Sequence, residues 1–153
     1  MAMSKGVPVH SDSSKRPSMP NGIFTDAELA FIRSGRKLGR IATVGADGTP
    51  HVTPVGWRLT ARGDVIEVGG IDMPNTKKFR DVARKGRAAI VIDEVLPPWR
   101  PRGIEIRGNA EAVEQPEPVI RIHPRRIISW GLDDTGRYAR DVWQSPERAG
   151  REA

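Results

Sequence analysis

The sequence predicts a mainly β fold, a small barrel of about six antiparallel strands with helices at its openings. Three observations predict it. Short runs of β-forming residues follow one another and are separated by tight turns that contain glycine. Only two segments, one near the start of the chain and one at its centre, have the periodicity of an amphipathic helix. The 153 residues are enough for one hydrophobic core and too few for two.

The first expected element is a helix that begins after Thr25 and ends near Arg33. Thr25 is a good N-cap, and Glu28, three residues later, completes a capping box. The preceding residues 1–22 are rich in Ser, Pro, Lys and Gly and have no apolar periodicity, so we expect a disordered N-terminal tail there.

Three strands joined by short turns are expected next. Residues 41–44 contain β-formers, the turn at residues 45–48 supplies the positive φ that a hairpin needs, and residues 51–57 form the partner strand. A second turn at residues 62–64 leads into a strand at residues 65–68. Together these strands form an antiparallel meander.

The second helix is expected at residues 75–85, with Phe79, Val82 and Ala83 as its buried stripe. The remaining strands are expected at residues 88–92, 104–108, 110–113, 119–122 and 127–130. The last two form either a strand pair or one bulged strand broken by Pro124. The folded domain then spans residues 23–133, and residues 134–153 form a charged, weakly helical C-terminal tail.

The composition narrows the classes of site. The chain has no cysteine, which removes disulfides, thiolate metal ligands and Cys nucleophiles and fits a reducing cytoplasm. No apolar run approaches the ~20 residues of a membrane span, and we find no metal-ligand spacing, phosphate-binding loop or hydrolytic constellation. The net charge of +6 suits nucleic acid, an acidic membrane surface or a polyanionic small molecule.

The segment "NTKKFR" at residues 75–80 is the strongest clue to function. Lys77, Lys78 and Arg80 stand at the start of a helix, where each cation faces the positive end of the helix dipole at a cost of up to ~1 kcal/mol. A phosphate would reverse this effect, because backbone N–H groups and ammonium groups would converge on one anion. Asn75 and Thr76 could add side-chain donors. A solvated helix face explains the same residues equally well.

The strand "HVTPVGW" at residues 51–57 is the second clue. Pro54 removes a hydrogen-bond donor and so marks an edge or opening in the sheet, and Gly56 lets a flat ring approach the backbone. A planar cofactor would use both features, and an irregular edge strand with nothing bound is the alternative. A third clue is "PPWRPRG" at residues 97–103, where Trp99 stands beside two arginines. Such a group suits stacking or anion binding, and the alternative is that Trp99 packs over the end of the barrel.

Three segments carry a family resemblance, in this order: "GRIATVGADGTPHVTPVGW", "GGIDMPNTKKFRDVARKGRAAIVID" and "WRPRGIEIRGNAEAV". They resemble the pyridoxamine 5′-phosphate oxidase-like split β-barrel superfamily, with the closer match to its deazaflavin (coenzyme F420) branch. The closing "IRIHPRRIISWGLD" is typical of the same branch. The resemblance covers about residues 23–133. It implies a six-stranded antiparallel split β-barrel of the FMN-binding type and a homodimer with a cofactor groove at the subunit interface.

The resemblance also implies the residues of the site. The cofactor phosphate would lie against the basic helix start, which comprises Asn75, Thr76, Lys77, Lys78 and Arg80. The ring would lie along the strand that carries Val52, Pro54, Gly56 and Trp57. Candidates for the rim of the pocket, contributed by the second subunit, are Trp99, Arg102 and Trp130. No residue is assigned a catalytic role, and no metal is expected.

The implied activity is hydride transfer from coenzyme F420 to a small organic acceptor, in which the cofactor does the chemistry and the protein binds and orients it. A deazaflavin carries a phosphodiester and a polyglutamate tail, so a basic groove suits it better than it suits FMN. An FMN-dependent oxidoreductase of the same fold and a non-catalytic carrier of either cofactor are the alternatives. We expect no specific nucleic-acid binding. We also do not expect vitamin B6 oxidation, because the longer C-terminal segment that holds that substrate is absent.

Overall fold

The computed structural model describes residues 18–19 and 22–143. Its helices and strands follow in this order: α1 (Asp26–Arg33), β1 (Gly39–Val44), β2 (Pro50–Leu59), β3 (Ile66–Gly69), the 3-10 helix η1 (Met73–Asn75), α2 (Lys77–Lys85), β4 (Arg87–Leu96), β5 (Arg100–Val113), β6 (Val119–Trp130) and β7 (Arg137–Asp141).

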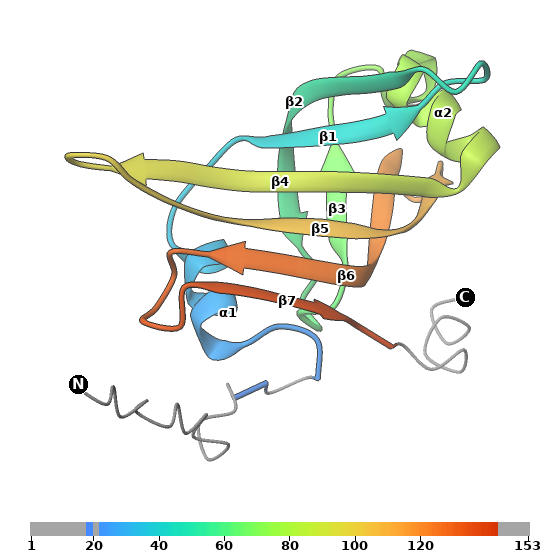
Figure 1. The fold of residues 1–153 in the computed structure, drawn as a ribbon. Coiled ribbons are helices and arrows are strands. Elements are labelled where there is room, and N and C mark those ends of the chain that lie inside the picture. Colours follow the sequence, from blue (N-terminus) through green and yellow to red (C-terminus); the bar gives the residue numbers. More distant parts are fainter. Residues whose placement is uncertain (1–17, 20–21, 144–153) are drawn as a thin grey trace, which may run out of the picture.

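Strands β1 to β6 close on themselves (Figure 1). The first half of β2 pairs with β1 and its second half pairs with β3. Because β3 also pairs with the first half of β6, while β4 and β5 connect β1 to β6, these pairings join the six strands in a closed ring. Every pairing is antiparallel, which confirms the predicted mainly β fold.

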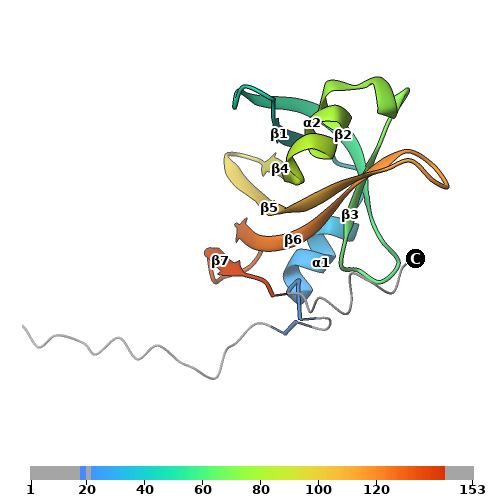
Figure 2. The same ribbon diagram turned by 90° about the vertical axis from the view of Figure 1, so that its right-hand side faces the viewer.

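The interior of the barrel is filled by isoleucine side chains that alternate along the strands, as one buried face of each strand requires. The fully buried ones are Ile41, Ile66, Ile90, Ile92, Ile104, Ile106, Ile120, Ile122 and Ile127. Helix α1 lies at one end of the barrel and α2 at the other (Figures 1 and 2). The two helices therefore cover the openings, as predicted.

Helix α1 is fixed by the predicted capping box. The Thr25 backbone N–H donates to Glu28 Oε1 at 2.9 Å, and Thr25 Oγ1 accepts from the Glu28 backbone N–H at 3.1 Å. Glu28 is buried and also binds Arg140 of β7, whose Nη2 lies 2.6 Å from Glu28 Oε1. The segment that holds β7 was expected to be weakly helical, and that prediction was wrong for residues 137–141. The second half of β6 offers a free edge, and β7 pairs with it.

Several element boundaries also differ from the predictions. The two strands expected at residues 104–108 and 110–113 are parts of one strand, β5, whose pairing with β6 shifts register between Arg107 and Gly108. Residues 119–130 form the single strand β6, with Pro124 inside it. Helix α2 begins at Lys77 because η1 occupies the preceding turn. The predicted disordered and charged tails fall largely on residues 1–17 and 144–153, outside the described residues.

The buried face of α2 also differs from the prediction. Phe79 and Val82 are buried as expected, whereas Ala83 is exposed and Asp81 is buried instead. A carboxylate on the inner face of a helix needs polar partners, and these partners matter for the site described below. In the part of the chain that the structure describes, no helix has the length and apolar character to cross a membrane.

Candidate functional site

The outer face of β2 is open. Val52, Pro54 and Gly56 are exposed on it, whereas Val55 points into the barrel. The Val52 side chain is 66% exposed. Gly56 pairs with Gly69 of β3, and a Cβ added at either glycine would meet no atom within 4 Å. The two strands therefore present a strip of bare, flat backbone that a planar group can approach closely.

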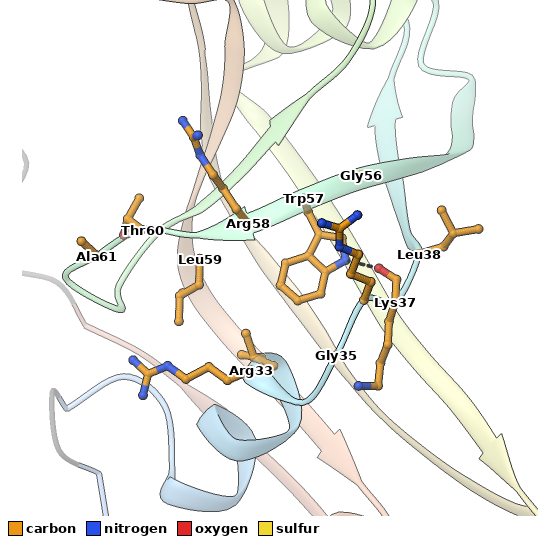
Figure 3. Close-up of a pocket in the computed structure, with 12 residues that line it drawn as sticks. Arg33, Gly35, Lys37, Leu38, Gly56, Trp57, Arg58, Leu59, Thr60 and Ala61 are labelled. Atoms are coloured by element: carbon orange, nitrogen blue, oxygen red, sulfur yellow. Dashed lines mark hydrogen bonds between the residues drawn. The ribbon is translucent and has the colours of Figure 1, made fainter.

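The structure places Trp57 on the opposite face of β2 from these residues, and its indole points toward the linker between α1 and β1 (Figure 3). Its Nε1–H donates to the backbone oxygen of Lys37 at 2.8 Å. The indole also covers Gly39 of β1, where an added Cβ would lie 2.9 Å from Trp57 Cδ1. Trp57 thus ties the linker between α1 and β1 to the barrel, and it is not part of the outer strip with which the sequence grouped it.

The turn before α2 is built by hydrogen bonds among its own residues. Asp72 adopts a left-handed conformation with φ of 54°, and its Oδ1 accepts from Asn75 Nδ2 at 2.9 Å. Thr76 is the N-cap of α2, where its Oγ1 accepts from the Phe79 backbone N–H at 3.3 Å and donates to the Met73 backbone oxygen at 2.7 Å. The polar side chains of Asn75 and Thr76 therefore shape the turn that aims the helix start.

Lys77 turns back toward the buried Asp81. Its Nζ lies 3.0 Å and 3.1 Å from the two carboxylate oxygens, and Thr43 Oγ1 of β1 donates to the same group at 3.0 Å. Burial opposes ionisation of Asp81, but the hydrogen bonds from Lys77 and Thr43 and the charges of Lys77 and Arg84 outweigh it and lower the pKa of Asp81. Lys77 therefore stabilises a carboxylate that joins α2 to β1.

The donors that remain at the start of α2 come from Lys78 and Arg80. Among the described residues, the Lys78 side chain has no hydrogen-bond or ion-pair partner, and the backbone N–H groups of Lys77 and Lys78 have no acceptor. Arg80 is exposed and donates one bond, from Nη1 to the Asn75 backbone oxygen at 2.8 Å. Backbone and side-chain donors thus converge where the helix dipole is positive, which is a suitable place for an anion.

A polar cavity of about 540 Å³ adjoins this helix. It lies between α2 and the turn that joins β1 to β2, and its lining residues are Ala46, Asp47, Thr49, Lys77, Arg80, Asp81 and Arg84. Both arginines in this lining, Arg80 and Arg84, come from the exposed side of α2. The positively charged region therefore extends beyond the first turn of the helix, which the sequence treated as the limit of the site.

The three predicted rim residues lie away from α2. Trp99 is 76% exposed at the tip of the β4–β5 hairpin, which projects from the barrel on the side opposite α2 (Figure 1). Arg102 binds Glu94, with Nε 2.7 Å from Oε1, and lies over the Phe31 ring at 5.4 Å. Trp130 is half-buried at the end of β6. Within one chain these residues do not meet the helix start.

A second groove was not predicted from the sequence. It has a volume of about 650 Å³ and lies between the linker that follows α1 and the second half of β2 (Figure 3). Its lining residues are Ile32, Arg33, Gly35, Arg36, Lys37, Leu38, Gly56, Trp57, Arg58, Leu59, Thr60 and Ala61.

Among the described residues, no group of three or more His, Cys, Asp or Glu side chains could hold a metal ion.

Known proteins resemble this chain in sequence. The model of the pyridoxamine 5′-phosphate oxidase family matches residues 24–143. A curated relative, the 5a,11a-dehydrotetracycline/5a,11a-dehydrooxytetracycline reductase of Streptomyces rimosus subsp. rimosus, is 40% identical over 133 residues that cover 78% of this chain and 93% of the relative.

Solved structures share the fold at lower sequence identity. A conserved hypothetical protein from Mycobacterium tuberculosis has a TM-score of 0.62 at 21% identity and covers 85% of this chain and 99% of its own. A structure described as an F420 reductase has a TM-score of 0.50 at 18% identity, covering 64% of this chain and 94% of its own. An FAD-binding protein from Mycobacterium smegmatis has a TM-score of 0.53 at 19% identity and covers 69% and 92%. At these identities the likeness shows the fold alone.

Proposed function

This chain belongs to the pyridoxamine 5′-phosphate oxidase family, and from that premise we propose that it is an oxidoreductase with a flavin-type cofactor on the outer face of β2 and β3. One observation carries the proposal. The bare backbone strip at Gly56 and Gly69 is followed in the chain by the turn that leads into α2, whose first N–H groups can bind an anion. A planar ring with a phosphate-bearing chain matches that sequence of surfaces.

The residues present fit such a group. Val52, Pro54 and Gly56 form a bed for the ring, and Lys78, Arg80 and the free N–H groups of α2 form a cradle for the phosphate. Lys77 has an indirect role, because it holds the start of α2 in place through Asp81. The described cradle thus supplies positive charge without leaving a buried charge unpaired.

The cofactor that we propose is coenzyme F420, with FMN as the alternative. The phosphodiester and polyglutamate tail of F420 carry more negative charge than FMN does. The basic surface extends past the helix start to Arg84, which suits the more anionic cofactor. Held by Lys78 and Arg80 and oriented on the β2 strip, the reduced cofactor would supply a hydride (two electrons) to an electron-poor double bond of a small organic acceptor, and water would supply the accompanying proton. The reductase name of the 40%-identical relative supports a reduction of this kind.

We further propose that the protein works as a homodimer. The outer faces of β1, β2 and β4 carry a cross-strand row of apolar residues, Val52, Ala42 and Ala89, and the neighbouring Val91 also points outward. A second barrel on this face would adjoin the cofactor bed, because Val52 belongs to both surfaces. Light scattering checks this: the wild type is expected to have the mass of two chains and Val91→Asp that of one. A wild-type mass of one chain at micromolar concentration refutes the dimer.

Titration with F420 and with FMN in parallel tests the cofactor proposal. We expect micromolar or tighter F420 binding and at least about tenfold weaker binding by Gly56→Val, because the new side chain would stand in the ring bed. No atom lies within 4 Å of that position, and a β-branched residue suits a strand, so the variant is expected to fold. Arg137→Val, at an exposed strand position of β7, is the matched control.

The outcomes separate the alternatives. Tighter binding of FMN than of F420 assigns the protein to the FMN-dependent class. Binding of F420 without hydride transfer to any of a broad panel of acceptors, 5a,11a-dehydrotetracycline included, makes the protein a carrier. If neither cofactor binds, or if Gly56→Val binds as the wild type does, the proposed bed is wrong. A cytoplasmic location stays a prediction of the sequence.

A further inference from the structure

The groove between the α1–β1 linker and β2 has an apolar, aromatic wall. Trp57 and Leu59 form this wall, and Leu38 lines the groove with its side chain pointing away from the indole (Figure 3). Leu38 is 59% exposed, which is high for a leucine next to a cavity. The Trp57 ring is held in one orientation by its hydrogen bond to the Lys37 backbone oxygen. A fixed indole beside an open cavity is a good surface for a flat ring.

The charged residues that line this groove are all cationic: Arg33, Arg36, Lys37 and Arg58. Two of them are already engaged elsewhere. Lys37 Nζ donates to the backbone oxygen and Oγ of Ser34 at 2.6 Å and 2.9 Å. Arg58 binds Glu67 and Glu117, with contacts of 3.1 Å and 2.7 Å.

Arg33 and Arg36 have no ion-pair or side-chain hydrogen-bond partner among the described residues. Arg33 lies in the last turn of α1, where a cation also complements the helix dipole. Arg36 follows that helix and has no such role. The groove therefore offers two uncommitted guanidinium groups beside an aromatic wall, which favours a ligand with a planar apolar body and an anionic group.

The groove meets the proposed ring bed at Gly56. The last residue pair of β1 with β2 is Gly39 with Val55, so Leu38 and Gly56 stand one step beyond it, side by side. Both residues line the groove, and Gly56 also belongs to the bare strip on the outer face. A ligand in the groove would therefore have one end next to the cofactor ring.

We propose that this groove binds the acceptor of the reduction, and that the acceptor is a ring-containing organic anion, a carboxylate or an enolate. Its planar body lies against Trp57, and its negative group pairs with Arg36, with Arg33 nearby. Arg36 is then a residue that determines specificity and takes no part in the transfer of hydride. The identification of the ligand as the acceptor rests on the proposed function, whereas the anion site itself does not.

Binding of 2-naphthoate, compared with its neutral counterpart 2-naphthamide, tests the site in the absence of any cofactor. We expect calorimetry to show at least about tenfold tighter binding of the carboxylate, which is the size of one charge-assisted contact. Arg36→Ala should abolish that difference and Arg36→Lys should restore part of it. Arg87→Ala, which removes an equal charge at the α2 end of the barrel, should leave it unchanged. Equal affinities for both probes, or an unaffected Arg36→Ala variant, overturn the proposal.

The indole N–H signals in a ¹H–¹⁵N spectrum locate the probe. We expect 2-naphthoate to shift the Trp57 signal, identified by its loss in Trp57→Phe, and to leave that of Trp99 at the hairpin tip in place. A shift confined to other tryptophans places the probe elsewhere and refutes the site.

Kinetics with reduced cofactor distinguish a failure of this proposal from a failure of the proposed function. For an anionic acceptor, Arg36→Ala should raise KM at least about tenfold while kcat and the Kd of the cofactor stay unchanged. If no cofactor binds, the proposed function fails while the naphthoate result still decides the anion site. If turnover occurs with an unchanged KM in Arg36→Ala, the acceptor binds elsewhere and the groove assignment is wrong.

Discussion

Lys77 and Lys78 are adjacent in the sequence, yet the structure predicts different consequences when each loses its charge. Replacement by methionine keeps most of the aliphatic chain at both positions, so Lys77→Met and Lys78→Met form a matched pair. Lys77 binds the buried Asp81, whereas the Lys78 side chain has no partner among the described residues. We expect the first variant to lose stability and the second to lose cofactor affinity.

The magnitudes follow from burial and distance. Lys77 makes two contacts of 3.0 Å and 3.1 Å with Asp81, whose side chain is 2% exposed, but 48% of the Lys77 side chain is exposed to solvent. Because solvent screens the charge of this half-exposed lysine, we expect Lys77→Met to lower the free energy of unfolding by only about 1–2 kcal/mol. Lys78→Met should change it by less than about 0.5 kcal/mol.

For cofactor binding the order is reversed. Loss of a charge-assisted contact with a phosphate costs about 1.5–3 kcal/mol, so Lys78→Met should weaken binding roughly 10- to 150-fold. Urea unfolding measures the first quantity, and fluorescence titration of F420 measures the second. If Lys78→Met binds as tightly as the wild type while Lys77→Met binds weakly, Lys77 is the phosphate ligand and its pair with Asp81 opens on binding. If both variants bind normally, the phosphate lies elsewhere.

Three further predictions concern stability. Asp81 has a lowered pKa in the folded protein, so its contribution to stability is present above the unfolded value of about 3.9 and is lost as pH falls through the folded value; urea midpoints of Asp81→Asn should therefore fall less than those of the wild type below about pH 4. Arg140→Met should cost about 3 kcal/mol in urea unfolding, since it leaves the buried Glu28 carboxylate without its cation, and a loss under about 1 kcal/mol would contradict this. Gly108→Ala should cost at least about 2 kcal/mol or prevent folding, because a Cβ there would lie 2.0 Å from the His123 backbone oxygen, and wild-type melting would show that the strands can separate at this point.

Local structure could be read from the sequence where it depends on neighbouring residues. The capping box at Thr25 and Glu28 and the glycine turn before β2 both act within a few residues, and the structure contains them as predicted. The continuous strand β5 and the added strand β7 could not be read in this way. Each is decided by the edge that β6 offers, and β6 is far away in the sequence from some of the strands it meets.

The sequence by itself determined the fold class, the two helices, the basic start of α2 and the open strand with Pro54 and Gly56. Periodicity, caps and turn residues encode these features locally. Only the tertiary structure decided which side chains are free to act. It buried Asp81 beside Lys77, turned Trp57 away from the outer strip, and joined the linker at Arg36 to the strand at Gly56 in one groove. Each of these outcomes depends on contacts between residues that are distant in the sequence and close in the folded chain. The local pattern of residues therefore does not specify them.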